Sequence, residues 1–358
     1  MRFLILGAGA VGAWVGANLV MARQAVTFVG RPAFAQSACA QGVHVTLPSG
    51  ETWRLRDVDV AISLAEALQR PSPAYDAVLL CVKAHGLDRA IDELRGCADK
   101  LSGALFVAFQ NGVGNEEKLA TVFGERRVLA ATLTSPIAVG GPAAVRLERL
   151  GGGVGLAALS ADQSWQPVAH ALSRAPLLNL KTYADWRAMK WSKLLLNIMG
   201  NATSALLSAP VAEIYDDRRL FALEMRMLRE ALAVMAAHAP PIAAVNLPGH
   251  PARFLALALK LLPDSALQVL LSRRVAQGRG NKYPSLYYDV ATRSGRSEVN
   301  VLNGAVAEIG RQLGVPTPVN AALAELVQQA TQPGSALSPQ VARRALEQLA
   351  GLRRGDAS

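Results

Sequence analysis

The chain has 358 residues, of which 51% are hydrophobic and 18% charged, a balance that can bury a sizeable core and excludes an intrinsically disordered protein. This length is more than one core usually holds, so we predict two domains. The net charge of +10 suits an anionic partner, but the basic residues occur in short pairs and no nucleic-acid-binding motif is present. We therefore expect no nucleic acid, and instead a phosphorylated cofactor or an acidic metabolite.

The cysteines, histidines and apolar runs indicate whether the protein has disulfides, a metal site or a membrane segment. The three cysteines show no CxxC spacing, which argues against a disulfide framework and for a reducing compartment. The five histidines are scattered, so we expect no metal site. Beyond the N-terminal segment, no uninterrupted apolar stretch reaches membrane length. We predict a cytoplasmic protein with no membrane partner.

The N-terminal run MRFLILGAGAVG predicts a strand that leads through a glycine turn into a helix. Residues 3–6 are β-type, and residues 7–12 form the GxGxxG motif of dinucleotide-binding folds. Gly7 permits the tight turn, Gly9 lets the backbone approach a pyrophosphate, and Gly12 lets the helix pack against the strand. The run also resembles a signal peptide, but the glycines explain it better. The predicted cofactor-binding residues here are Gly7, Gly9, Ala10, Val11 and Gly12.

The second strand-like run, AVTFVGR at 25–31, indicates which dinucleotide is bound. Enzymes that use NAD usually place Asp or Glu at the end of this strand, where it holds the ribose 2′-hydroxyl. Here the strand ends in Gly30 and Arg31. An arginine suits the 2′-phosphate of NADP through charge-assisted hydrogen bonds. We predict that the cofactor is NADP(H); the alternative is that Arg31 is an ordinary surface arginine.

The rest of the first half alternates between strand-like and helix-like runs. The strand-like runs lie at residues 43–47, 57–62, 77–83, 104–109 and 128–134, and helix-like stretches at 87–94 and 116–122. Such alternation predicts an α/β fold with a Rossmann-type, doubly wound sheet. One of these runs ends at Lys83, and another is followed directly by Gln110, Asn111 and Gly112. Doubly wound sheets bind ligands at the carboxyl ends of their strands. Because Asn-Gly is also a common turn pair, ordinary loops remain the alternative.

From about residue 182 the strand-like runs end and long helical stretches follow. They cover residues 184–207, 218–238, 252–262, 265–276 and 298–313. We therefore predict an NADP-binding Rossmann-type domain over 1–175, an all-α substrate and catalytic domain over 182–335, and a C-terminal tail over 336–358 that contains a short surface helix. This order suggests a dehydrogenase whose substrate lies between the two domains.

One helical segment, KWSKLLLNIMGNATSALL at 190–207, contains an unusual polar stripe. Lys193, Asn197 and Asn201 recur four residues apart and so share one face of a helix. Burying such a group without a hydrogen-bond partner costs about 2 kcal/mol or more. We therefore expect a polar ligand to bind to these side chains. The alternative is that Lys193 reaches solvent and both asparagines satisfy backbone groups.

Several motifs together resemble the ketopantoate reductase (2-dehydropantoate 2-reductase) family. In chain order they are GAGAVG at 7–12, CVKA at 81–84, QNGVGNE at 110–116, KLLLNIMGNATSAL at 193–206, PSLYYDVATRSGRSEVNVLNG at 284–304 and LGVPTPVN at 313–320. The resemblance extends over roughly residues 1–330. A single motif of this kind would prove little, but their shared order makes the resemblance specific.

The resemblance implies a role for each polar residue. Lys193 matches the family's general acid, which delivers a proton to the substrate oxygen as hydride arrives. Glu298 matches an acidic residue that contacts substrate or cofactor and helps to place the lysine. The implied substrate-binding residues are Asn111, Asn197, Asn201 and Ser285, with Ser285 on the substrate carboxylate. The implied cofactor-binding residues outside the glycine turn are Arg31, Lys83, Asn111 and Glu298.

The implied activity is NADPH-dependent reduction of ketopantoate, a small anionic 2-oxo acid, to (R)-pantoate on the route to pantothenate and coenzyme A. Some features depart from the family pattern: residues 242–282 are expanded, Asn300 replaces an aspartate, and Val211 follows Pro210. Another branched 2-oxo acid is therefore an alternative substrate. A non-catalytic NADP(H)-binding redox sensor is the alternative from another class, and a homodimer is possible.

Overall fold

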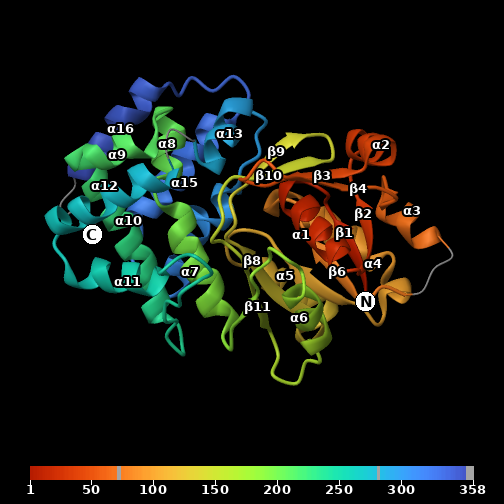
Figure 1. The fold of residues 1–358 in the computed structure, drawn as a ribbon. Helices are drawn as coiled ribbons and strands as arrows, with labels where there is room; N and C mark the ends of the chain where they lie inside the picture. The colour runs from red at the N-terminus through yellow and green to blue at the C-terminus, as the bar shows by residue number, and fades with distance from the viewer. Residues whose placement is uncertain (71–73, 280–282, 352–358) are drawn as a thin grey trace. The chain divides into compact units, whose positions relative to one another are not determined.

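The computed structural model describes residues 1–70, 74–279 and 283–351, and the chain divides into two compact units. Unit 1 comprises Met1–Gln110, Gly114–Lys190 and Asn246–His250. Unit 2 comprises Asn111–Val113, Trp191–Val245 and Pro251–Ser358. Strands and helices alternate in unit 1, whereas unit 2 is built from helices (Figure 1). The predicted fold class, a Rossmann-type sheet followed by a helical region, is confirmed.

The main sheet of unit 1 has eight strands in the order β12-β11-β8-β7-β6-β1-β2-β5. Their bounds are β1 Arg2–Leu6, β2 Ala25–Val29, β5 Asp59–Ala61, β6 Ala77–Leu80, β7 Leu105–Ala108, β8 Val128–Leu133, β11 Val154–Ala158 and β12 Lys181–Thr182. From β5 to β8 all neighbours are parallel, and β11 joins β8 in the antiparallel direction. Most residues of the parallel strands are apolar, as expected for strands that are covered on both faces.

Alternate residues of the central strand β1 enter two separate cores. Phe3 and Ile5 belong to one buried cluster, and Leu4 and Leu6 to the other, because successive side chains of a strand point to opposite faces. The helices of unit 1 are α1 Ala10–Met21, α2 Pro32–Gln41, α3 Leu64–Gln69, α4 Leu87–Arg95, α5 Asn115–Phe123 and α6 Gln166–Ser173. Its 3-10 turns are η1 Ala84–Gly86, η2 Ala98–Leu101 and η3 Glu125–Arg127.

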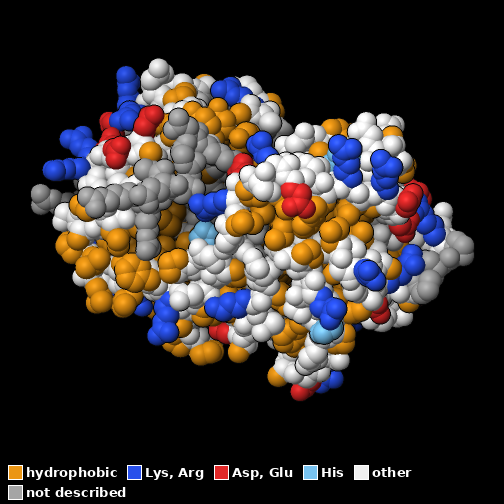
Figure 2. Space-filling view, in the orientation of Figure 1, with side chains coloured by type: hydrophobic (Ala, Val, Ile, Leu, Met, Phe, Trp, Pro, Cys, Tyr) orange, Lys and Arg blue, Asp and Glu red, His pale blue; other side chains and the backbone are white. Residues whose placement is uncertain are grey.

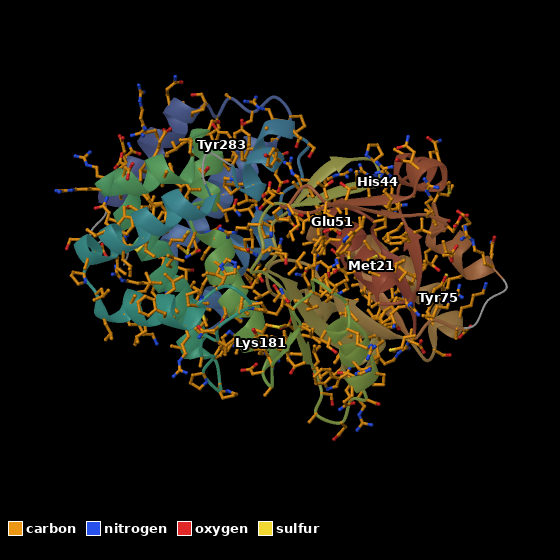
Figure 3. The ribbon with its side chains drawn as sticks, viewed as in Figure 1. Met21, His44, Glu51, Tyr75, Lys181 and Tyr283 are labelled. Carbon is orange, nitrogen blue, oxygen red and sulfur yellow. The ribbon has the colours of Figure 1, made fainter. Side chains whose placement is uncertain are left out.

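A second, four-stranded sheet contains a segment that the sequence analysis assigned to the main sheet. Its order is β4-β3-β10-β9, with bounds β3 Val43–Thr46, β4 Thr52–Leu55, β9 Ile137–Gly141 and β10 Ala144–Leu147. In β3, Val43 and Val45 are buried whereas His44 and Thr46 are half-buried, which is the alternation of a sheet with one solvated face. His44 and Glu51 locate this sheet in Figure 3.

The helices that follow residue 185 include the long central helix α10. Their bounds are α7 Trp186–Ile198, α8 Asn201–Leu207, α9 Val211–Asp216, α10 Arg218–Ala237, α11 Ala252–Leu261, α12 Asp264–Arg279, α13 Ser285–Thr292, η4 Glu298–Val301, α14 Asn303–Gln312, α15 Pro318–Thr331 and α16 Pro339–Gly351. Helix α10 packs against α9, α11, α12, α14, α15 and α16. The tail helix α16 is therefore docked, through buried Leu346 and Ala342. Among the helices described, none is long and apolar enough to cross a membrane.

Helix α11 also presents an apolar outer face. Phe254, Leu257 and Leu261 are exposed on it, at spacings of three and four residues that place them on one side of a helix. Figure 2 shows this hydrophobic surface. It lies in the segment 242–282, which the family resemblance predicts to be expanded. The predicted homodimer stays a prediction.

Two segments that were predicted to be continuous helices are each divided in the structure. The segment 184–207 breaks between α7 and α8, where Gly200 adopts a φ of +61°. The segment 298–313 breaks between η4 and α14 at Leu302, whose φ and ψ are both −106°. Helical periodicity continues through both breaks in the sequence, so periodicity alone could not reveal them.

Candidate active site

The glycine turn after β1 has the geometry that the motif predicts. Gly7 has a φ of +102°, and the backbone N–H groups of Gly7 and Ala8 both donate to the Val29 carbonyl at 3.0 Å. A Cβ on Gly12 would lie 2.2 Å from the Gly7 oxygen, whereas a Cβ on Gly9 would meet no atom within 4 Å. Gly12 is thus required for close packing of α1, and the space over Gly9 is open to a ligand. Ala10 and Val11 begin α1 and are partly exposed.

Two exposed cations follow the strands on either side of β1. Arg31 follows β2 and is the N-cap of α2, and Lys83 follows β6 and is the N-cap of η1. Both are exposed, and β2 and β6 are the two parallel neighbours of β1. The glycine turn, Arg31 and Lys83 therefore occupy the carboxyl ends of three adjacent strands, the edge at which doubly wound sheets bind ligands.

These residues fit a phosphorylated dinucleotide. The first turn of α1 contains no acidic residue, so the positive end of the helix dipole is available to a pyrophosphate. Arg31 occupies the end of β2 where an enzyme that uses NAD would place a carboxylate. Its guanidinium could hold a 2′-phosphate, and Lys83 adds a second positive charge at the same edge.

In unit 2, two hydrogen-bonded pairs join four of the predicted substrate-binding residues. The side-chain amide of Asn197 donates to Asn111 Oδ1 at 3.2 Å. The amide of Asn201 donates to Ser285 Oγ at 3.2 Å and to the Asn197 carbonyl at 3.0 Å. Lys193 is half-buried on α7, the helix that also carries Asn197. The polar stripe is thus retained across the break, because Asn201 still meets the carbonyl four residues before it.

In the structure, the Asn201 side chain binds the start of α13 and so positions Ser285. Its side chain is 3% exposed, and its Oδ1 accepts the N–H of Leu286 at 3.0 Å, next to Ser285 at the start of α13. The donor and the acceptor of this amide are therefore both used by the protein. Ser285 itself is exposed. Contact of Asn201 with a substrate stays a prediction.

A buried carboxylate holds the break that precedes Asn201. Glu224, on α10, is fully buried and accepts the N–H of Gly200 at 2.7 Å and the hydroxyl of Thr203 at 2.5 Å. A Cβ on Gly200 would lie 2.3 Å from Val211 Cγ1. Val211, one of the departures from the family pattern, therefore packs against the glycine at the break.

Asn111 and Glu298 are carried by segments that touch within unit 2. Gly112 has a φ of +83°, and a Cβ there would lie 2.1 Å from the Val301 oxygen. The N–H of Val113 donates to that same oxygen at 3.2 Å. Because Glu298 begins the 3-10 turn that ends at Val301, the Asn-Gly pair is packed against the turn that carries Glu298 and is not a simple surface loop.

Glu298 is buried, with 6% of its surface exposed. Its N–H donates to Asp289 Oδ2 at 3.1 Å, and Ser297 caps the turn by accepting the N–H of Val299. By contrast Asn300, which stands where the family has an aspartate, is exposed and accepts a hydrogen bond from the Gln328 amide. This departure thus lies on the surface of unit 2.

The end of the 284–304 motif and the 313–320 motif make structural contacts in unit 2. Glu230 accepts the N–H groups of Val319 and Asn320 at 3.0 and 2.9 Å and so caps the start of α15. The amide of Asn303 donates to Asn320 Oδ1 at 3.0 Å. Burial raises the pKa of Glu230, and its hydrogen bonds with Asn320 and Val319 oppose that shift.

The sequence analysis did not single out a buried ion pair in unit 1. Lys190 Nζ lies 2.8 Å from Glu116 Oε1, and the two side chains are 1% and 0% exposed. Burial raises the pKa of the Glu116 carboxyl, and the positive charge of Lys190 opposes that shift. Both residues lie in segments that had been noticed, at the end of QNGVGNE and at the start of KWSKLLL. The sequence signal that could have revealed this pair is Lys190, a charged residue at the start of an apolar helical segment.

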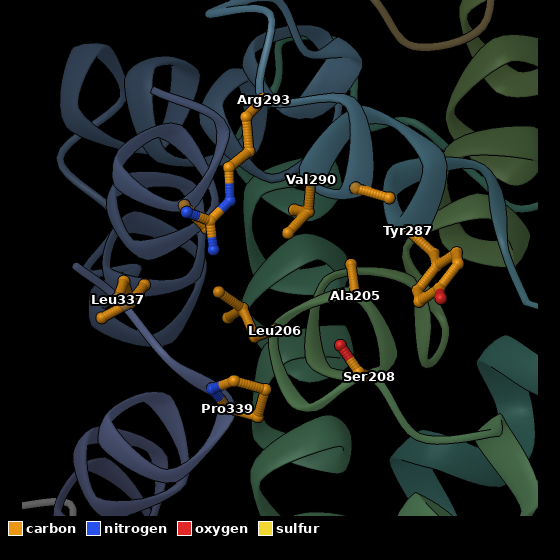
Figure 4. Close-up of a pocket in the computed structure, with 10 residues that line it drawn as sticks. Ala205, Leu206, Ser208, Tyr287, Val290, Arg293, Leu337 and Pro339 are labelled. Carbon is orange, nitrogen blue, oxygen red and sulfur yellow. The ribbon is translucent and has the colours of Figure 1, made fainter. Parts of the chain in front are cut away.

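A cavity of about 210 Å³ lies elsewhere in unit 2, between α8, α13 and the segment before α16 (Figure 4). Leu206, Val290 and Leu337 contribute apolar walls. Among the described residues that line it, Arg293 is charged, and it donates to the Ser335 carbonyl at 2.9 Å. None of the predicted catalytic or substrate-binding residues lines this cavity.

The fold, with its glycine turn and basic strand ends, is that of a dinucleotide-binding oxidoreductase. Residues 3–160 match the family model "Ketopantoate reductase PanE/ApbA", and residues 185–331 match "Ketopantoate reductase PanE/ApbA C terminal". The two matches together span most of the sequence. The chain belongs to the ketopantoate reductase family.

Individual relatives match over almost their whole length. A 2-dehydropantoate 2-reductase of Halobacterium salinarum is 28% identical over 340 residues, which cover 93% of this chain and 100% of the relative. The structure of a PanE/ApbA family ketopantoate reductase from Ralstonia eutropha JMP134 has a TM-score of 0.74 and 27% identity, covering 92% of this chain and 98% of that one. A D-mandelate dehydrogenase, solved with NADH and anilino(oxo)acetate, has a TM-score of 0.73 at 19% identity, covering 98% and 100%; this likeness shows the fold alone.

Proposed function

We propose that this protein reduces ketopantoate to (R)-pantoate with NADPH, in the cytoplasm, as a step towards pantothenate and coenzyme A. The observation that carries the proposal is the pair of hydrogen bonds, Asn197 to Asn111 and Asn201 to Ser285, beside the half-buried Lys193. The curated relatives named 2-dehydropantoate 2-reductase support the choice of substrate.

In the proposed reaction, bound NADPH supplies a hydride to the C2 carbonyl carbon of the keto acid. Lys193 donates a proton to the carbonyl oxygen, so that the ketone becomes a secondary alcohol. Its ammonium also stabilises the negative charge that develops on that oxygen, an effect of about 10²–10⁴ in rate for a positioned acid. Regenerating the ammonium then requires one proton from solvent per turnover.

The neighbouring residues are assigned to orientation. We assign Asn111 and Asn197 to the polar groups of the substrate and Ser285, which is exposed at the start of α13, to its carboxylate. Asn201 holds Ser285 and contacts the substrate in addition. Glu298 contacts substrate or cofactor and helps to place Lys193. Asn111 and Glu298 also contribute to cofactor binding.

We assign cofactor binding in unit 1 to the glycine turn, Arg31 and Lys83. Arg31 follows β2 and carries no competing carboxylate beside it in the sequence GRP. Charge-assisted hydrogen bonds from its guanidinium to the 2′-phosphate would favour NADPH over NADH. The D-mandelate dehydrogenase neighbour was solved with NADH. The preference of this protein for NADPH over NADH is therefore to be measured directly, by comparing the two dissociation constants.

A different 2-oxo acid is the second candidate substrate. The observation that favours it is the expanded segment 242–282, part of which forms α11 and α12. The D-mandelate dehydrogenase neighbour was solved with anilino(oxo)acetate, a bulky compound of the same 2-oxo class. The mechanism assigned to Lys193 would be unchanged.

The test is consumption of NADPH by the purified protein with ketopantoate, beside a panel of branched, aromatic and small 2-oxo acids. We expect the highest kcat/KM for ketopantoate. A higher kcat/KM for another keto acid would mean that the proposed mechanism is right but that this keto acid, and not ketopantoate, is the substrate. Tight NADPH binding without turnover of any keto acid would favour the non-catalytic sensor.

A further inference from the structure

The buried Lys190–Glu116 ion pair of unit 1 lies at the carboxyl edge of the main sheet. Lys190 is the last residue of unit 1 on α7, and Glu116 belongs to the first turn of α5. Besides Glu116 Oε1 at 2.8 Å, the Lys190 ammonium reaches the carbonyl oxygens of Gln110 at 2.5 Å and Ala131 at 3.3 Å. The ammonium thus forms one ion pair and two hydrogen bonds to backbone carbonyls.

The Gln110 side chain extends this network to the neighbouring strand. Its Nε2 donates to the Leu80 carbonyl at 2.9 Å and to the Val82 carbonyl at 3.1 Å. Gln110 is 3% exposed and comes directly before Asn111 in the chain. The residue that leads into the Asn-Gly turn is therefore held through its backbone by Lys190 and through its side chain by the end of β6.

Stability alone is a poor explanation for such a pair. Burying two charges is costly, and an apolar pair of similar size is often as stable or more stable. What an apolar pair cannot do is to hold a backbone carbonyl in one place. The Lys190 ammonium donates to the Gln110 oxygen, and Glu116 offers a countercharge to that ammonium.

We propose that Lys190 and Glu116 are positioning residues that fix the Gln110 carbonyl and thereby the backbone turn that carries Asn111. This inference rests on the proposed function, in which Asn111 meets the substrate. Neither residue touches the reacting atoms: Lys190 acts through Gln110, and Glu116 acts by holding Lys190 in place.

Three variants test the proposal: E116Q, K190M and the charge-balanced K190M/E116Q. We expect each to lower kcat for the best 2-oxo acid by about tenfold or more, since small displacements of a positioning group are costly to catalysis. The Kd for NADPH should change much less than kcat, because the glycine turn and Arg31, which we assign to the phosphates of the cofactor, belong to other segments of unit 1. The double variant is decisive, since it carries no unpaired buried charge but cannot hold the Gln110 carbonyl.

The matched control is L94A, which removes a fully buried side chain of unit 1 on α4 without touching the pair. A merely structural pair would behave like this control: the variants would lose Tm while kcat stayed at the wild-type value. That result would overturn the proposal. Reduced kcat in K190M/E116Q together with unchanged kcat in L94A supports it.

Hydrogen–deuterium exchange of residues 109–115 provides a readout that does not depend on turnover. We expect faster exchange of this segment in K190M/E116Q than in wild type or L94A, and equal exchange in all three would also overturn the proposal. If wild type turns over no 2-oxo acid, the proposed function fails on its own, and the exchange measurement still decides whether the pair holds the turn.

Discussion

The side-chain amide of Asn197 donates to the side-chain oxygen of Asn111 at 3.2 Å, across 86 residues of sequence. Asn197 belongs to the polar stripe of α7, and Asn111 to the Asn-Gly turn that is packed against Val301. The contact joins two motifs of the family within one unit. It uses one of the two hydrogens of the Asn197 amide.

This pair is expected to act jointly on the substrate. The variants N111A, N197A and the double variant form a cycle, in which each single change should lower kcat/KM and the double change should cost less than the sum. The expected coupling is about 0.5–1.5 kcal/mol, the range of a hydrogen bond between neutral groups. Strict additivity of the two losses would show that the asparagines act independently.

Replacing Lys193 by alanine should lower kcat by about 10²–10⁴-fold, the usual contribution of a positioned acid. The Kd for NADPH, measured by fluorescence titration, should be unchanged. Lys118 is a matched control, because it is exposed and its ammonium pairs with Asp88 at 2.8 Å on the surface; K118A should keep full activity. Wild-type turnover in K193A would remove the proposed mechanism.

Replacing Arg31 by alanine should weaken NADPH by about tenfold or more, as expected for the loss of charged hydrogen bonds. NADH lacks the 2′-phosphate and should be affected much less. The ratio of the two dissociation constants is the quantity to compare. R89A, which removes an exposed arginine of α4, is a control for lost positive charge. An equal loss with both cofactors would mean that Arg31 does not read the 2′-phosphate.

Replacing Gly200 by alanine should destabilise unit 2 by about 1–3 kcal/mol, the range for strained backbone conformations. The new Cβ would combine a φ of +61° with a contact of 2.3 Å to Val211 Cγ1. Denaturant unfolding gives the loss directly. In a V211A background the same change should cost less, because only the backbone strain remains; an equal cost in both backgrounds would argue against the contact.

The sequence by itself determined the features whose causes are local. The strand, glycine turn and helix at residues 1–21 follow from short-range preferences, since only glycine tolerates the φ of Gly7 and the close approach at Gly12. The periodicity of the apolar residues likewise predicts the change from alternating strands to helices near residue 182. Family resemblance supplied the roles that we propose for Lys193, Ser285 and Glu298.

Only the tertiary structure decided the features that depend on distant partners. The break at Gly200 is held by Glu224, which lies on another helix, and the strand at 43–46 pairs in a sheet separate from the main one. Lys190 meets the Gln110 carbonyl across 80 residues. Such contacts follow from where whole elements pack, and no spacing along one chain specifies which buried charge will meet which carbonyl.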